Sequence, residues 1–156
     1  MKFHRLFVAL AVFLTACALS SCTSAPDAPD LTLSGVDGSR IEINQGTGLT
    51  AVFFFSVNNP VALGALHRLA DELDTGVDAV AIALDVDRPP NISILQQQIL
   101  IPIVIDEANR VGKAFGGIQL TPTLILVDSG KILLRQQGRM DLTVVNKRAQ
   151  SLNGSS

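Results

Sequence analysis

Thiols and imidazoles, the side chains that most often do chemistry near neutral pH, are scarce in this chain of 156 residues. Its two cysteines are Cys17 and Cys22, both near the N-terminus, and its two histidines are His4 and His67. Thiol–disulfide exchange needs a thiolate that attacks sulfur, and peroxide reduction passes through the sulfenic acid of the same group. A metal site needs several ligands, so we expect His67 to be a surface or boundary residue and expect neither a bound metal ion nor a cofactor.

A predicted strand-to-helix turn is the second place where polar side chains gather. Residues 49–57, LTAVFFFSV, form an apolar run long enough for a central strand buried on both faces. Asn58, Asn59 and Pro60 follow, and helical spacing begins at Val61. Amide side chains do not ionise, but asparagine is a favoured helix N-cap and proline suits the first helical position. The turn is therefore predicted to stabilise a helix start and to lack a nucleophile.

Carboxylates and overall charge indicate no further site. Asp85, Asp87 and Asp106 come at the ends of predicted strands, where we expect solvated side chains and not cation ligands. No glycine-rich phosphate loop follows a strand. The chain has 12 basic and 14 acidic residues, a net charge of −2, without a basic patch. Nucleic acid is therefore not an expected partner.

The N-terminal residues 1–21 are predicted to be an export signal. A short basic start, MKFHR, precedes an apolar stretch and then small residues, and the apolar stretch is too short for a comfortable membrane span. LSSC, ending at Cys22, resembles the bacterial lipobox, whose cysteine becomes the lipidated N-terminus, and LTAC, ending at Cys17, resembles it too. We prefer Cys22, because the apolar stretch before Cys17 is short. An ordinary signal peptide, cut after a small residue, is the alternative.

These features predict a domain organisation and a location. After the signal we expect a polar tether over residues 22–30, TSAPDAPD being its main part, and a folded domain over 31–152. The expected protein is anchored to a membrane of the bacterial cell envelope by lipid and faces the periplasm or the exterior. Neither cysteine is followed by aspartate, a pattern that resembles outer-membrane sorting if the cell is Gram-negative.

Periodicity and turn signals predict the rest of the domain. Leu66, Leu69, Ala70 and Leu73 have the spacing of one helix face, which predicts a helix over 61–73. Alternating strands and helices imply right-handed parallel crossovers, with helices on both faces of a mixed sheet. The other expected elements are hairpins at 31–43 and 121–138, strands at 77–86 and 101–106, and helices at 91–100, 107–117 and 141–152.

This layout resembles the thioredoxin fold, and more closely its exported redoxin and TlpA-like (AhpC/TSA-related) branch, over about residues 30–150. The resemblance implies a three-layer α/β/α sandwich with a mixed central sheet and an N-terminal β-hairpin. It also implies a cis peptide bond between Thr121 and Pro122. The segments that carry it are LTLSGVDGSRIEI at 31–43, AVFFFSVNNPV at 51–61, VDAVAIALDVD at 77–87 and GIQLTPTLILVDSGKIL at 117–133.

The chain departs from the family at the reactive turn. A family C-x-x-C falls on residues 58–61, or a family C-P-x-C on residues 59–62, and we slightly favour the second register. The residues at these positions are Asn58, Asn59, Pro60, Val61 and Ala62, and none is cysteine. The dithiol and peroxidatic mechanisms therefore both lack their nucleophile.

Three functions remain as hypotheses. The resemblance implies a surface that pairs with an extended peptide, and we predict that it binds an envelope peptide or protein without catalysis. The alternative is a thiol–disulfide oxidoreductase or peroxidase-related redoxin, as the family implies. The second alternative is a purely structural domain with a degenerate site. The residues predicted to form the binding surface are Asn59, Pro60, Gln119, Leu120, Thr121 and Pro122.

Overall fold

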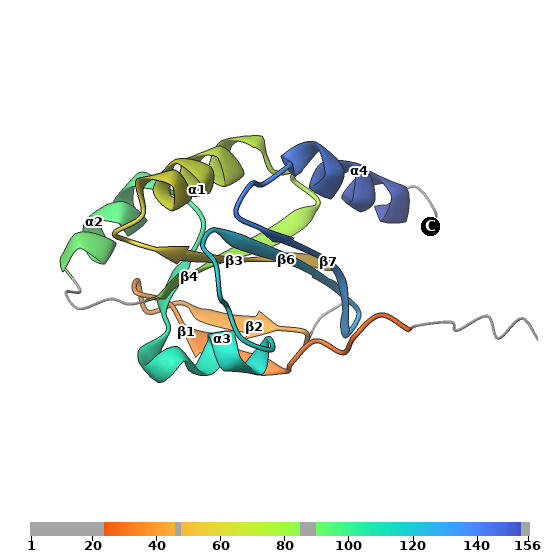
Figure 1. The fold of residues 1–156 in the computed structure, drawn as a ribbon, viewed down its shortest axis with the longest axis horizontal. Helices are drawn as coiled ribbons and strands as arrows, with labels where there is room; N and C mark the ends of the chain where they lie inside the picture. The colour runs from red at the N-terminus through yellow and green to blue at the C-terminus, as the bar shows by residue number, and fades with distance from the viewer. Residues whose placement is uncertain (1–23, 46–47, 85–89, 154–156) are drawn as a thin grey trace, which may run out of the picture.

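A computed structural model describes residues 24–45, 48–84 and 90–153 of the chain (Figure 1). The predicted signal segment, with both cysteines, lies outside the described residues, and so do Asp85 and Asp87. Among the described residues no helix is both long and apolar enough to span a bilayer.

A five-stranded mixed sheet forms the centre of the domain. Strand β3 (Leu49–Ser56) lies in its middle, with β4 (Val77–Leu84) parallel on one side and β5 (Ile103–Ile105) parallel beyond β4. On the other side β6 (Thr123–Asp128) runs antiparallel to β3, and β7 (Lys131–Gln137) closes the edge. Six of the eight residues of β3 are buried and the other two are half-buried, as its continuous apolar run predicts for a central strand.

Three helices cover one face of this sheet: α1 (Pro60–Glu72), α2 (Pro90–Gln98) and α4 (Leu142–Asn153) (Figure 1). Phe53 and Phe55, two residues apart on β3, point into this layer with their ring centroids 6.1 Å apart. The period of two in a strand explains why both rings share one face. The buried helix residues that pack with them include Leu66, Leu69, Ile92, Val145 and Ala149.

The opposite face is covered by an N-terminal hairpin and a short helix (Figure 1). The hairpin pairs β1 (Leu31–Ser34) with β2 (Arg40–Ile43), and the helix is α3 (Arg110–Ala114). Phe54 of β3 points to this side, where its ring meets Phe115 edge-on at 5.6 Å. The predicted three-layer α/β/α sandwich with a mixed sheet and an N-terminal hairpin is confirmed.

The region after β5 differs from the prediction. In place of one helix over 107–117, a 3-10 turn, η1 (Glu107–Asn109), precedes α3. Ala108 and Asn109 have positive φ angles of 56° and 55°, which interrupt the helix. The expectation of a solvated Asp106 is wrong. Its carboxylate is buried and accepts hydrogen bonds from the backbone N–H groups of Val111 at 2.9 Å and Gly112 at 2.8 Å.

Part of the segment predicted as a tether is docked on the sheet. The N–H of Ile132 donates to the carbonyl of Pro26 at 2.8 Å, and the N–H of Ala28 donates to the carbonyl of Gly130 at 2.8 Å. Between them Asp27 forms an antiparallel bridge and an ion pair with Lys131. Ala28 is buried in the core cluster on the hairpin side. Ordered contacts therefore begin before residue 31.

Candidate functional site

Asn59 sits at the corner where β3 turns into α1, and its side-chain oxygen caps the helix. Oδ1 accepts hydrogen bonds from the N–H groups of Val61 at 3.0 Å and Ala62 at 3.3 Å. Pro60, the first helical residue, has no N–H that would need a partner. The predicted N-cap is therefore confirmed, and Asn59 satisfies N–H groups that the first turn of a helix leaves unbonded.

The other end of the same amide reaches the loop before β6. Asn59 Nδ2 lies 3.1 Å from the carbonyl oxygen of Thr121 and 3.4 Å from its Oγ1. The bond between Thr121 and Pro122 is cis, as the resemblance implies. One amide thus acts as acceptor toward the helix and as donor toward the cis-proline loop. An aspartate could cap the helix equally well, but a carboxylate has no N–H to donate to Thr121.

The remaining predicted residues surround this contact. Asn58 is exposed, and Gln119 and Leu120 are exposed on the loop side. Pro122 is buried, and its carbonyl accepts from the N–H of Gly138 at 2.7 Å, which joins the loop to the end of β7. The structure brings Asn59 and Thr121 into direct contact, and we refer to Asn59, Pro60 and residues 119–122 together as the cis-proline corner.

The cis-proline corner offers apolar surface and one backbone N–H group without a partner in the described residues. Val61 is 68% exposed and Leu120 is 52% exposed, so two of the five large hydrophobic side chains that are exposed in the described residues belong to or border this corner. The N–H of Thr121 makes no hydrogen bond within the described part of the chain. A free N–H beside exposed apolar side chains is the arrangement by which an extended peptide adds to a protein surface.

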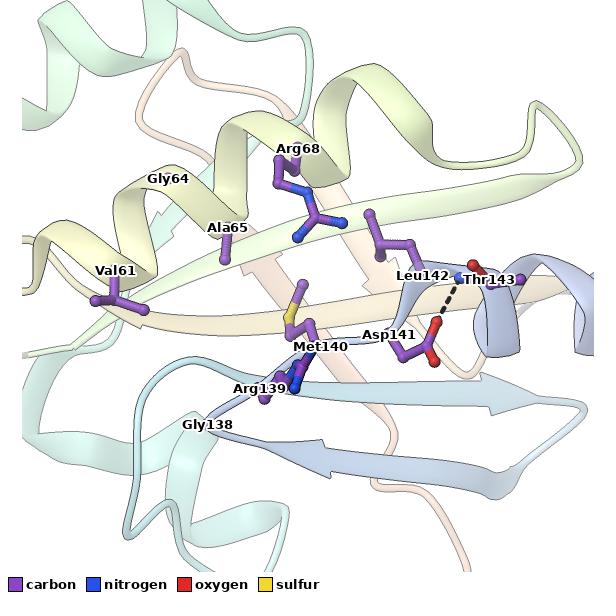
Figure 2. Close-up of a pocket in the computed structure, with 10 residues that line it drawn as sticks. All are labelled: Val61, Gly64, Ala65, Arg68, Gly138, Arg139, Met140, Asp141, Leu142 and Thr143. Atoms are coloured by element: carbon purple, nitrogen blue, oxygen red, sulfur yellow. Dashed lines mark hydrogen bonds between the residues drawn. The ribbon is translucent and has the colours of Figure 1, made fainter.

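A groove that sequence reasoning missed lies next to the cis-proline corner (Figure 2). Its volume is about 670 Å³, and it lies between α1 and the connection from β7 to α4. Figure 2 shows Arg68 reaching into it from the helix, with Arg139 and Met140 on the opposite side. We call it the α1 groove; it is lined by Val61, Gly64, Ala65, Arg68, Gly138, Arg139, Met140, Asp141, Leu142 and Thr143.

The charged side chains of the α1 groove differ in how they are paired. Arg68 Nε donates to Glu72 Oε1 at 3.1 Å, and this pairing lowers the pKa of Glu72 and raises the pKa of Arg68. Asp141 Oδ1 accepts from the N–H of Thr143 at 3.0 Å at the start of α4. Arg139 is exposed and makes no ion pair or hydrogen bond within the described residues. It is therefore the group in the groove whose charge is least compensated.

Metal-binding side chains do not cluster in the described parts of the chain. No group of three or more His, Cys, Asp or Glu side chains lies close enough there to hold an ion. His67, mid-way along α1, is exposed, as predicted. The cis-proline corner and the α1 groove present hydrogen-bonding, apolar and charged groups.

Comparisons by sequence return no relatives: no protein-family profile matches the chain, and no curated protein does. Comparison by structure returns many. StoA from Bacillus subtilis superposes with a TM-score of 0.67 at 19% identity, over 78% of this chain and 98% of that protein. The pneumococcal exposed lipoprotein thioredoxin Etrx1 from Streptococcus pneumoniae gives 0.64 at 16% identity, over 79% and 99%.

A third similar structure is a secreted disulfide oxidoreductase from Mycobacterium tuberculosis. Its TM-score is 0.65 at 11% identity, over 78% of this chain and 96% of that protein. Each of the three is matched over nearly its whole length by this chain. The chain therefore has the thioredoxin-like fold.

Proposed function

We propose that this protein binds an extended segment of another envelope protein at the cis-proline corner, without redox catalysis. The observation that carries the proposal is the double hydrogen bonding of Asn59, whose amide caps α1 and holds Thr121 at 3.1 Å. An asparagine in this position keeps the corner assembled and supplies no group that attacks sulfur. The free N–H of Thr121 and the exposed side chains of Val61 and Leu120 remain available to a peptide.

The geometry also supports one of the two registers. Asn59, and not Asn58, contacts the cis-proline loop, and Ala62 is fully buried while Val61 is exposed. In the register 59–62 the first position is half-buried beside Thr121 and the fourth position is buried. In the other register both outer positions, Asn58 and Val61, are exposed.

We further propose that the protein is held at the cell envelope by a lipid on Cys22, with Cys17 as the other candidate. The support is the pattern of residues 1–22 together with the structural neighbours, one of which is an exposed lipoprotein and another a secreted protein. Intact mass of the purified mature protein tests this, because a diacylated or triacylated N-terminal cysteine adds a defined mass to the chain.

Retention of a partner tests the binding proposal. Immobilised protein should retain an envelope protein from the native host, and Thr121→Arg should abolish retention, because a long charged side chain would cover the loop backbone. Thr75→Arg is the matched control, since Thr75 is exposed on the turn between α1 and β4, away from the corner. A partner that Thr121→Arg does not release would contradict binding at the cis-proline corner.

Thiol oxidoreductase activity is the alternative, and the family likeness of the fold is what favours it. Residues 23–156 contain no cysteine, so the reaction would have to run without a thiol of the folded part. A reductase assay with insulin as substrate, on protein beginning at residue 23, should give no turnover above a blank without protein. Measurable turnover would favour the oxidoreductase.

A further inference from the structure

The α1 groove is continuous with the cis-proline corner, so a peptide held at the corner can extend into it. Val61 borders both, and Gly138, which lines the groove, donates its N–H to Pro122 of the corner at 2.7 Å. From Val61 to Arg68 the helix rises about 10 Å, at 1.5 Å per residue. That is the length of about three residues of extended peptide, at 3.3 Å each.

Gly64 lines the α1 groove, and the packing of the fold does not require a glycine at this position. A glycine inside a helix costs about 1 kcal/mol relative to alanine. A Cβ at this position would meet no atom within 4 Å, and the residue is exposed, so neither close packing nor a turn requires glycine here. Because Gly64 lines the groove, a longer side chain there would stand at its rim.

The charges around the groove favour an anionic ligand. Both carboxylate oxygens of Glu72 accept from Arg68, at 3.1 Å and 3.3 Å. Asp141 lies at the N-terminal end of α4, where the helix dipole compensates negative charge, and it accepts from Thr143. Arg139 has neither kind of compensation within the described residues. A ligand carboxylate would thus find an unpaired guanidinium, above a floor that includes the buried side chains of Met140 and Leu142.

We propose that the α1 groove binds an acidic residue of the bound peptide through Arg139. Arg68 lines the end of the groove that is farther from the cis-proline corner. This inference rests on the proposed function and specifies the chemistry of its partner. The acidic residue lies one to three positions from the peptide residue that pairs with Thr121, and an apolar neighbour contacts Met140. A peptide, and not a small anion, is the occupant because Gly138 of the groove bonds to Pro122 and lies against Leu120, so that one extended chain can contact both the groove and the corner.

The test is selection from a cysteine-free display library of random eight-residue peptides on the immobilised full chain. The expected result is a set of peptides with Asp or Glu at one fixed position. Arg139→Gln should weaken the best acidic peptide about fivefold, the size of a partly exposed ion pair. The same variant should leave the counterpart peptide, with glutamine in place of its acidic residue, unchanged.

Two further variants separate charge from folding. Arg148→Gln removes the same charge from an exposed site on α4 outside the α1 groove and should leave selection as in the wild type. Gly64→Gln fills the groove with a helix-favouring residue, so it should weaken the acidic peptide while the protein stays at least as stable as the wild type.

The outcomes distinguish the two proposals. If the selected peptides have no acidic preference, or if that preference survives Arg139→Gln, recognition of an acidic residue by Arg139 is overturned. The cis-proline corner then remains a binding site. Selection of no peptide, or selection that Thr121→Arg leaves intact, overturns the proposed function and this inference with it. N-acetylglutamate binding as tightly as the best peptide would overturn the choice of a peptide as the occupant.

Discussion

At the scale of single residues, Asn59 links the start of α1 to the cis-proline loop. Its amide satisfies two backbone N–H groups of α1 and donates to Thr121, so three contacts depend on one side chain. A thiolate would accept hydrogen bonds from a helix start as well, but it would not donate toward a carbonyl. Asn59 therefore provides a fixed link between helix and loop that a thiolate at the same position would not provide.

Asn59→Ala should lower the free energy of unfolding by about 2 kcal/mol, since it removes both a helix cap and the link to Thr121. Urea denaturation followed by far-UV circular dichroism measures the change. Asn58→Ala is the matched control, because Asn58 is exposed and its side chain makes no hydrogen bond within the described residues, and it should change stability by less than about 0.5 kcal/mol. Equal effects of the two variants would contradict the role given to Asn59.

Asp106 is a second residue whose role depends on tertiary structure. Its buried carboxylate holds the N–H groups of Val111 and Gly112 after the 3-10 turn. Asp106→Ala should cost about 2–3 kcal/mol, because two buried N–H groups lose a charged acceptor. Chemical denaturation checks the value, and Asp128→Ala, at the other end of the sheet and partly exposed, should cost clearly less.

At the scale of elements, α1 carries the corner at its start and the paired Arg68 and Glu72 near its end. The bond from Arg68 lowers the pKa of Glu72 below its ordinary value of 4.5, chiefly through the side-chain hydrogen bond. A carboxyl whose pKa is lower in the folded state stabilises that state at pH values above 4.5. This stabilisation is lost as the pH falls from 4.5 through the lowered pKa.

NMR titration of the Glu72 side chain should therefore give a pKa below 4.5, and the Arg68→Gln variant should return it toward the ordinary value. Both side chains are about half exposed, so the global stability of the protein should change little across this range. A Glu72 pKa that does not respond to Arg68→Gln would show that the ion pair is not populated in solution.

The elements with strong periodicity could be predicted from sequence, and those set by single backbone angles could not. The apolar run at 49–57 and the helical spacing that includes Leu66 and Leu69 predict the bounds of β3 and α1 to within a residue or two. The interruption before α3 could not be predicted, because Ala108 and Asn109 adopt positive φ angles and no glycine at these positions indicates such a conformation.

Some parts of the candidate site could likewise be predicted from the sequence, and others could not. Asn59 as a cap, Pro60 as the first helical residue and the cis bond before Pro122 follow from local residue types or from the family likeness. The α1 groove does not, since Arg139 and Met140 lie in a connection that only the tertiary fold brings beside α1. The one local signal was Gly64, a glycine inside a helical pattern.

At the scale of the whole molecule, residues 26–28 protect the edge of the sheet. Their backbone pairs with residues 130–132, and the start of β7 is thereby covered. An unpaired sheet edge is a template for pairing with another chain. Residues 26–28 therefore contribute to the stability of the folded domain.

Deleting residues up to 30 should lower the free energy of unfolding by about 1–3 kcal/mol, from two lost backbone hydrogen bonds and the buried methyl of Ala28. It should also increase self-association. Denaturation and light scattering compare protein beginning at residue 23 with protein beginning at residue 31. Lys131→Gln removes the exposed ion pair to Asp27 alone and should change stability by less than about 1 kcal/mol.

The docked segment also sets how the molecule would stand on a bilayer. With a lipid on Cys22, as proposed, only four residue steps separate the acylated end from Pro26, at most about 14 Å. The turn joining β6 to β7 would then face the headgroups. Because β6 runs from Thr123 beside the cis-proline corner to Asp128 at that turn, the corner lies about 20 Å from the turn. The open surface would point toward whatever passes through the surrounding aqueous space, and lipid would not compete for it.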